Sequence, residues 1–252
     1  MSQVKIDIKI MGVEKRLPLI KEILRKAGIP DSCVVLDDRG FEGGGDAWYT
    51  AKKAWTAPLP EGCTHRLVIQ DDIDVVNNFV TLVNKVVTKF PNVAWTFNGG
   101  TWTTNNMKKN NSPYIRLKGC RASAQALLLP VEHIQPMINW SDDMFGVDYK
   151  HDDGRISWYC CANGIPMYST IPSLVSHIQV DSCIPHHNRK DRITKTWVGV
   201  NVDNENWNSI YVADTPLILK QIWLPKDDPR WPRINAMINK AKARLKLNLY
   251  TK

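Results

Sequence analysis

The chain has 252 residues, 43% of them hydrophobic, and a formal net charge of +8. This length most simply gives one large domain with a sizeable core, two smaller domains being the alternative. No run reaches the roughly 18 apolar residues of a membrane helix. Charged residues interrupt residues 1–13, so neither a signal peptide nor an integral membrane segment is expected.

The cysteines show no spacing typical of metal or redox sites. They are Cys33, Cys63, Cys120, Cys160, Cys161 and Cys183, and no two of them form a CxxC pair. An even number permits disulfides, but a chain of this length does not need them to fold. We therefore expect buried thiols and a reducing compartment.

The first half of the chain alternates between strand and helix patterns. Apolar alternation and short apolar runs predict the strands, while amphipathic spacing predicts the helices, which begin or end at capping residues such as Asp46 and Gly28. The predicted elements are strands over 4–13, 32–38 and 65–72, and helices over 16–28, 42–55 and 77–90. This order predicts an α/β fold with a mostly parallel sheet flanked by helices.

Each of these strands ends in residues suited to ligand binding. They are Met11 and Gly12 after the first strand, Asp37, Asp38 and Arg39 after the second, and Asp71, Asp72 and Asp74 after the third. Ligands of such sheets bind beyond the carboxyl ends of the strands. Clustered acids there favour Mg²⁺ or Mn²⁺ bridging to nucleotide phosphates. The alternative is that the acids cap the next helix, Asp74 in particular.

The segments after residue 90 add a polar loop, and further strands and helices. The loop 95–111 is rich in Gly and Asn, and its Trp102 is a candidate for stacking on a sugar or a base, as are Trp197 and Trp207. A strand and then a helix are predicted over 120–140. Another helix begins at the acid pair Asp152 and Asp153, which are candidates for a catalytic base or for N-capping.

Most of the excess positive charge lies in the C-terminal tail. After Asp228 no acid follows, and the basic residues are Arg230, Arg233, Lys240, Lys242, Arg244, Lys246 and Lys252. Apolar residues recur at helical spacing from Ile234 to Leu249, which predicts a helix docked on an apolar surface. The tail and a second basic cluster at 186–195 suit a polyanion such as nucleic acid, the alternative being an ordinary solvated face.

The segments "GGGDAWYTAKKAW" and "VIQDDIDVVNNF" resemble the nucleotide-sugar half of GT-A fold glycosyltransferases, which have a Rossmann-like sheet. In that family a strand ends in an acidic DxD element that holds a metal ion on the diphosphate of the sugar nucleotide. The resemblance implies that Asp72 is the principal metal ligand, and that Asp71 or Asp74 contacts the ribose or the metal. It also implies that Asp37, Asp38 and Arg39 face the nucleoside, with Met11, Gly12 and Lys52 beside the donor.

The resemblance extends, in patches, to about residue 200. "HDDGRISWYCCANG" and "PSLVSHIQVDS" are similar to segments of phage-encoded members. The similarity implies that Asp153 or Asp152 is the base that deprotonates the acceptor, and that His177 completes the metal shell. Arg189, Lys190 and Arg192 follow in a loop that is suited either to closing over the diphosphate or to contacting an anionic acceptor.

The sequence therefore predicts a metal-dependent glycosyltransferase that uses Mn²⁺ or Mg²⁺ and a nucleoside diphosphate sugar, with a uridine diphosphate sugar as first choice. Residues 1–225 would form the catalytic domain, with the nucleotide-sugar half over 1–90 and the acceptor half over 91–225, and 226–252 a basic helix packed on it. Hydroxymethylated bases of phage DNA are the first choice of acceptor, which places the enzyme in the host cytoplasm.

Several alternatives remain open. A transferase acting on lipopolysaccharide or another surface glycan would direct its basic residues at phosphorylated lipid. A non-catalytic nucleic-acid-binding protein, a nucleotide-sugar hydrolase and a metal-dependent nuclease are also compatible with clustered acids and basic patches. The sequence does not predict the sugar, the stereochemistry of transfer or the oligomeric state.

Overall fold

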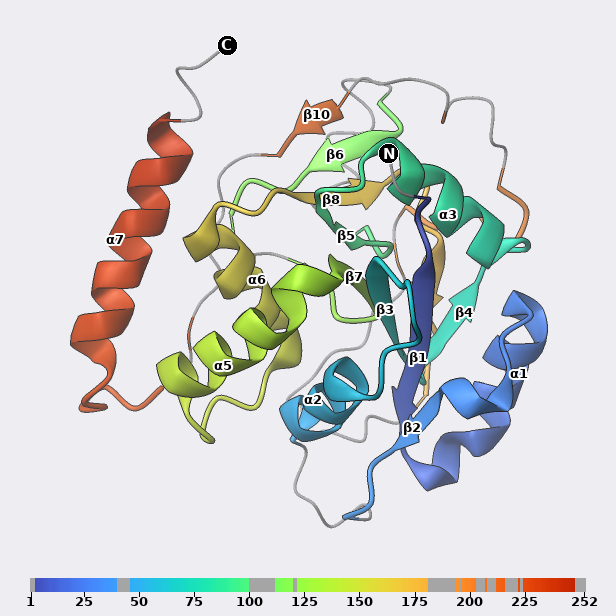
Figure 1. Cartoon of the computed structure of the whole chain (residues 1–252), viewed down its shortest axis with the longest axis horizontal. Coiled ribbons are helices and arrows are strands. Elements are labelled where there is room, and N and C mark those ends of the chain that lie inside the picture. Colours follow the sequence, from blue (N-terminus) through green and yellow to red (C-terminus); the bar gives the residue numbers. More distant parts are fainter. Residues whose placement is uncertain are drawn as a thin grey trace.

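The computed structural model describes residues 3–39, 46–99, 112–119, 122–180, 194, 196–202, 207, 212–215, 222 and 224–247. Within these ranges, eight strands form one sheet (Figure 1). In order across the sheet they are β10 (Val212–Asp214), β6 (Tyr114–Arg116), β8 (Met167–Thr170), β5 (Ala94–Thr96), β7 (Ala126–Pro130), β3 (His65–Gln70), β1 (Ile6–Gly12) and β2 (Val34–Leu36). A separate pair joins β4 (Ile73–Val75) to β9 (Val175–His177).

The sheet is parallel at one end and mixed at the other. Strands β2, β1 and β3 are parallel, as the alternation of strands and helices predicts, and β5 is parallel to β8. Strand β7 runs antiparallel to both β3 and β5, and β6 runs antiparallel to β8. The predicted α/β class, with helices flanking a mostly parallel sheet, is confirmed.

Helices cover both faces of the sheet. They are α1 (Leu17–Ala27), α2 (Ala47–Thr56), α3 (Phe79–Lys89), α5 (Ile134–Phe145), α6 (Asp152–Asn163) and α7 (Trp231–Leu247), with single 3-10 turns η1 (Glu14–Arg16), η2 (Asp31–Cys33) and η4 (Val131–His133). Two predicted caps are confirmed. Gly28 ends α1 in the left-handed conformation at φ 66°, and Asp46 begins α2 by accepting a hydrogen bond from the Tyr49 amide.

Side-chain alternation along β3 divides the core between the two faces. Leu67 and Ile69 pack with α1 and α3, whereas Val68 packs with α2, α5 and α6 on the opposite face. Successive side chains of a strand point to opposite faces, so a strand covered on both sides is apolar throughout. Figure 1 shows α2, α5 and α6 together on one side of the sheet, and α1 beside α3 on the other.

The predicted C-terminal helix exists and docks on the α5–α6 pair. Ile234, Met237 and Ala241 of α7 are buried in one cluster with Phe145 and Trp158. The absence of acids after Asp228 suggested that the basic residues of the tail have no acidic partners. This expectation is wrong for the start of the tail, where acids from other segments form ion pairs. The Arg230 guanidinium pairs with Asp148 and Asp228, and that of Arg233 pairs with Asp143.

Two further expectations concern membranes and thiols. No helix in the described ranges is both long enough and apolar enough to span a bilayer. Among the described cysteines, Cys33, Cys63, Cys160 and Cys161 are not in disulfides. Only Cys160 is fully buried, and the other three are partly exposed.

Candidate active site

The carboxyl ends of β1, β2 and β3 meet at one edge of the sheet. Met11 of β1 lies level with Gln70 of β3, and Gly12 lies level with Leu36 of β2. The Asp37 amide donates to the Gly12 carbonyl at 2.9 Å. The acids that follow β2 and β3 are therefore neighbours of the end of β1, as expected for parallel strands.

Asp71 is held inside this edge by two donors. Its Oδ2 accepts a hydrogen bond from the Val13 amide at 3.0 Å, and its Oδ1 accepts one from Arg16 Nη1 at 2.7 Å. Both oxygens thus serve to join the end of β1 to the end of β3. Arg16 comes from the 3-10 turn that follows β1, and its guanidinium neutralises part of the negative charge of the acids.

Asp72 lies beside His177, which β9 brings in from a distant part of the chain. Strand pairing places His177 opposite Ile73, and the Ile178 amide donates to the Asp72 carbonyl at 2.9 Å. His177 Nε2 lies 3.3 Å from Asp72 Oδ2, and Arg16 Nη1 lies 3.2 Å from the same oxygen. The other oxygen, Oδ1, is buried and has no hydrogen-bond partner among the described residues.

The two neighbouring carboxyls are shifted in opposite directions. Burial raises the pKa of Asp71, and the adjacent Asp72 charge adds to this against the opposing effect of Arg16. Burial would also raise the pKa of Asp72, but its contacts with His177 and Arg16 outweigh burial and lower that pKa. Of these two neighbours, Asp72 is therefore the one that carries negative charge more readily.

Gly12 allows Asp71 to approach the end of β1. A Cβ at this position would lie 2.6 Å from Asp71 Oδ2 and 2.8 Å from Ile20 Cδ1, closer than unbonded atoms approach. We expect Gly12→Ala to lower the free energy of unfolding by about 1–3 kcal/mol, because the Asp71 carboxyl must shift. Urea unfolding measures this loss.

The matched control is Gly28→Ala. That position has φ 66°, and a Cβ added there would meet nothing within 4 Å, so only backbone strain of about 1 kcal/mol is expected. A Gly12→Ala variant as stable as the parent chain would contradict the tight contact with Asp71.

A second cluster follows β2 and joins it to α2. Asp37 accepts hydrogen bonds from Arg39 Nη2 and Thr50 Oγ1, both at 2.8 Å. The Arg39 guanidinium lies 3.7 Å from the centre of the Tyr49 ring, and the Tyr49 hydroxyl donates to Asp38 at 2.9 Å. The three predicted residues Asp37, Asp38 and Arg39 are thus brought together, with an aromatic face beside a guanidinium.

The Asp37 cluster should make stability fall in acid. Burial would raise the pKa of Asp37, but hydrogen bonds from Arg39 and Thr50 outweigh it and lower the pKa to about 2. A carboxyl with a lowered folded-state pKa stabilises the fold fully above its unfolded pKa of about 3.9 and loses this as pH falls toward 2.

We expect Asp37→Asn to be less stable than the parent by about 1 kcal/mol near neutral pH, after discounting for solvent screening, and the difference to shrink steeply between about pH 4 and pH 2. Urea unfolding of both proteins across this range measures it. A difference between the two proteins that stays constant with pH would contradict the assigned hydrogen bonds.

Lys52 and Lys53, which are neighbours on α2, have different partners. Lys52, the predicted donor ligand, pairs with Asp142 of α5. Lys53 instead approaches the end of β2, where its Nζ lies 3.0 Å from Asp38 and donates to the Leu36 carbonyl at 3.2 Å. Tyr49 and Lys53 are four residues apart and share one helical face, so helical phase counted from Asp46 could have identified them.

Of the two acids that open α6, the structure brings Asp152 to the site edge. Asp152 is buried, and its Oδ2 lies 3.4 Å from Gln70 Nε2 at the end of β3. Its Oδ1 accepts a hydrogen bond from the Asp153 amide, while Asp153 itself is partly exposed. The N-cap of the helix is His151, so neither acid is the cap residue itself.

Three other predicted site residues have partners or surroundings of their own. Asp74 is within β4 and pairs with Lys26 of α1 at 2.7 Å, so it caps no helix. Met11 is buried in the core rather than facing a ligand. Trp207 is buried too, and its indole donates to the Ile171 carbonyl, which corrects the idea that it stacks on a sugar. Arg189, Lys190, Arg192 and Trp102 lie outside the described residues.

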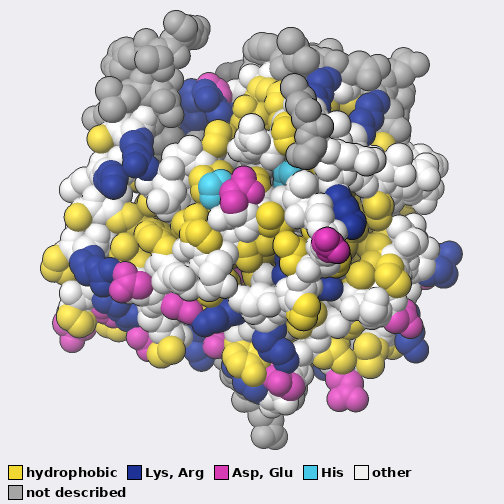
Figure 2. All heavy atoms as spheres, viewed as in Figure 1, with side chains coloured by type: hydrophobic (Ala, Val, Ile, Leu, Met, Phe, Trp, Pro, Cys, Tyr) yellow, Lys and Arg dark blue, Asp and Glu magenta, His cyan; other side chains and the backbone are white. Residues whose placement is uncertain are grey.

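Figure 2 shows how charge is distributed on the face that includes α7. Dark blue side chains follow α7, with magenta ones among them near its lower end, in keeping with the Arg230 and Arg233 ion pairs. Beyond that turn, Lys240 and Lys242 are exposed. The net positive part of the helix is therefore its second half.

Within the described residues, no group of three or more His, Cys, Asp and Glu side chains is arranged to hold a metal ion. Asp72 and His177 supply two side chains that are able to bind a metal ion, and its further ligands would have to come from a bound substrate or water. No protein-family model matches the sequence, and a comparison with curated proteins found no match.

Proposed function

We propose that this protein is a metal-dependent glycosyltransferase that takes a sugar from a nucleoside diphosphate sugar, with a uridine diphosphate sugar as first choice. The observation that carries the proposal is the Asp72 carboxylate, charged, buried and with Oδ1 unpartnered among the described residues, beside His177 at the edge where β1, β2 and β3 end. A buried oxygen of this kind is costly unless a ligand satisfies it.

A divalent cation fits the chemistry of these donors. Mg²⁺ and Mn²⁺ accept one or two carboxylates and complete their shell with substrate phosphates and water, and an imidazole suits Mn²⁺. Asp72 and His177 would hold the ion, whose chemistry is to neutralise the diphosphate leaving group. Asp71, both of whose oxygens are already bonded, would position Arg16 and the end of β1 instead.

The cluster after β2 suits a nucleoside. Asp37 and Asp38 offer carboxylate oxygens to ribose or base donors, and Tyr49 offers an aromatic ring. Arg39 lies over that ring and supplies positive charge near the phosphates. These groups lie at the same edge of the sheet as Asp72. One bound nucleotide could therefore contact Asp72 through its phosphates and the cluster after β2 through its nucleoside.

Asp152 is the residue that we assign as base. It lies beside Gln70 at the end of β3, whereas Asp153 is more exposed and further along the helix. A base that accepts the acceptor proton contributes about 10²–10⁴-fold to the rate. Asp152→Asn should therefore lose far more transfer activity than Asp153→Asn.

We propose DNA carrying hydroxymethylated bases as the acceptor, because part of the protein surface is positively charged. The exposed lysines of α7 supply a cationic surface suited to phosphates. Transfer to such DNA should weaken steeply as salt is raised, whereas transfer to a neutral glycan should not.

The test is thermal denaturation with nucleoside diphosphates and nucleotide sugars, each with and without Mn²⁺. A ligand at 100 times its dissociation constant should stabilise by about 2.7 kcal/mol, a shift of roughly 5–10 °C. Stabilisation by one uridine nucleotide only with Mn²⁺ is the expected result. No response to any nucleotide, together with a salt-sensitive response to plain DNA, would favour a non-catalytic nucleic-acid-binding protein.

One observation favours a second candidate, a transferase that needs no metal. Arg16 Nη1 lies within 3.2 Å of both Asp71 and Asp72, so a guanidinium already neutralises part of the acidic pair. Nucleotide stabilisation that is the same with Mn²⁺ and with a chelator would support this candidate. It would overturn the metal assignment but leave the nucleotide site in place.

A further inference from the structure

Three amide side chains form a row across the sheet beside Asp152. They are Gln70 at the end of β3, Gln125 directly before β7 and Asn98 shortly after β5, and these three strands are neighbours. The backbone N–H of Gln70 donates to the Gln125 carbonyl at 3.0 Å, which continues the antiparallel pairing of β3 with β7. Residues opposite one another in such a pair have Cβ atoms about 5 Å apart on the same face of the sheet.

This amide row lies on the face of the sheet that α6 covers. Val68 and Leu127, two residues before Gln70 and two after Gln125, pack with α2, α5 and α6. Side chains two residues apart along a strand share a face. The hydrogen bond from Gln70 Nε2 to Asp152 Oδ2 at the start of α6, at 3.4 Å, agrees with this placement. The row is therefore next to the residue that we assign as base.

The amide of Gln125 is held in one orientation. Its Oε1 accepts hydrogen bonds from Asn98 Nδ2 at 3.0 Å and from the Ser123 hydroxyl. Asn98 is itself buried, and its Oδ1 accepts a hydrogen bond from the Thr194 hydroxyl at 2.8 Å. Because the oxygen of the Gln125 amide is already bonded, the group that Gln125 keeps for a ligand is the donor Nε2.

Two of the three amides keep hydrogen-bonding capacity. Gln125 Nε2, a donor, and Gln70 Oε1, an acceptor, have no partner among the described residues, and both residues are partly exposed. Asn98 differs, because it is buried and both atoms of its amide are bonded within the protein. A donor beside an acceptor matches neighbouring hydroxyls, each of which both donates and accepts. The row is thus suited to a polyhydroxyl compound.

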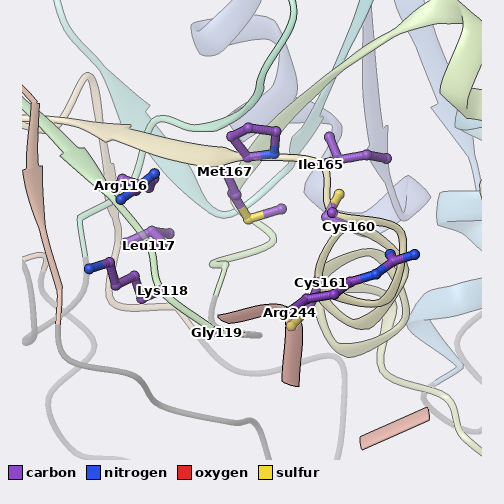
Figure 3. A pocket seen from close by; sticks show the side chains of 11 residues that line it. Arg116, Leu117, Lys118, Gly119, Cys160, Cys161, Ile165, Met167 and Arg244 are labelled. Carbon is purple, nitrogen blue, oxygen red and sulfur yellow. The ribbon is translucent and has the colours of Figure 1, made fainter. Parts of the chain in front are cut away.

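The amide row favours an uncharged ligand. Its members are neutral, and the charged group bonded to it is the Asp152 carboxyl. Asp152 and Asp153 already offset the positive end of the α6 dipole. The other end of α6 is different, because Arg116, Lys118 and Arg244 line a cavity of about 70 Å³ there (Figure 3). An anionic ligand at the row would lie beside a carboxylate, with no cation among the members of the row to compensate it.

We propose that Gln70 and Gln125 bind hydroxyls of the sugar that is transferred, and that this site selects a neutral sugar over a sugar acid. The inference rests on the proposed function and names the class of sugar that the donor carries. In that reaction the sugar lies between the diphosphate at Asp72 and the base Asp152. Gln70 precedes the acidic pair in the chain and donates to Asp152, so a sugar ring in this position lies beside the amide row.

Isothermal titration of the full chain with Mn²⁺ present tests the class of sugar. The ligands are uridine diphosphate and its conjugates with glucose, galactose and glucuronate. One of the two neutral conjugates should bind at least about tenfold more tightly than the glucuronate conjugate, because like charges would meet beside Asp152. Equal or tighter binding of the glucuronate conjugate would overturn the selection of a neutral sugar. Failure of every uridine nucleotide to bind would instead overturn the proposed function itself.

Variants locate the sugar. Gln70→Met and Gln125→Met should each weaken the binding of the preferred neutral conjugate about 3–10-fold, since each removes one hydrogen bond between neutral groups, and should change the binding of uridine diphosphate less than about twofold. Gln135→Met is the matched control, because Gln135 is exposed on α5 and donates to Asn139. Two targeted variants guard against a folding defect in one, which thermal denaturation reveals. Unchanged binding of the conjugate, or equal weakening of uridine diphosphate, would overturn the assignment while leaving the nucleotide site in place.

Discussion

Asp72→Asn should reduce manganese-dependent sugar transfer by about 10³-fold and abolish the manganese-dependent stabilisation by a uridine nucleotide. The substitution keeps the shape of the side chain and removes the charge that a divalent cation needs. It removes the negative charge from both carboxylate oxygens, Oδ1, which has no partner among the described residues, and Oδ2, which lies beside His177. Initial transfer rates and titration of Mn²⁺ in the presence of the nucleotide measure the two effects.

Asp74→Asn is the matched control. Asp74 pairs with Lys26 of α1 and is partly exposed, so its loss should cost at most about 1 kcal/mol of stability and little activity. Circular dichroism shows whether Asp72→Asn remains folded. Full manganese-dependent activity in a folded Asp72→Asn variant would contradict the proposed role of Asp72 as a metal ligand and leave Arg16 as the group that neutralises the acids.

The ends of the first three strands were predictable because they depend on local patterns. Alternating apolar residues mark β1, a short apolar run marks β3, and parallel strands bring their carboxyl ends together whatever the details of packing. Caps such as Gly28 and Asp46 act within one turn, so they too can be inferred from sequence. The meeting of Gly12, Asp37 and Asp71 follows from these features alone.

Contacts that depend on distant pairing could not be predicted in the same way. Strand β4 has three residues and exists through its pairing with β9, about 100 residues later, and that pairing carries Asp74 toward Lys26. The reversed direction of β7 is equally hidden, because a buried apolar run reads the same either way. Arg16 reaches Asp71 and Asp72 only through the 3-10 turn after β1, for which no pattern in the sequence is a guide.

Arg66 should be among the most costly residues to replace. It is 2% exposed, and it pairs with Asp7 at 2.6 Å. It also donates to the carbonyls of Trp55, Ala57 and Pro58, where α2 ends. Arg66→Met should lower the free energy of unfolding by about 3–5 kcal/mol, because it leaves Asp7 buried and those carbonyls without their donor.

A double-mutant cycle in urea separates the buried charge from the rest of this loss. Asp7→Asn combined with Arg66→Met should cost less than the sum of the two single changes, since the double variant holds no uncompensated buried carboxylate. Lys9, whose Nζ lies 3.5 Å from Asp7, offers a partial substitute partner and should keep Arg66→Met from unfolding outright. Arg25→Met is the control, because Arg25 pairs with Glu22 on the exposed face of α1 and its loss should leave the free energy of unfolding little changed. Strictly additive costs in the cycle would show that Arg66 stabilises the fold through the α2 carbonyls rather than through Asp7.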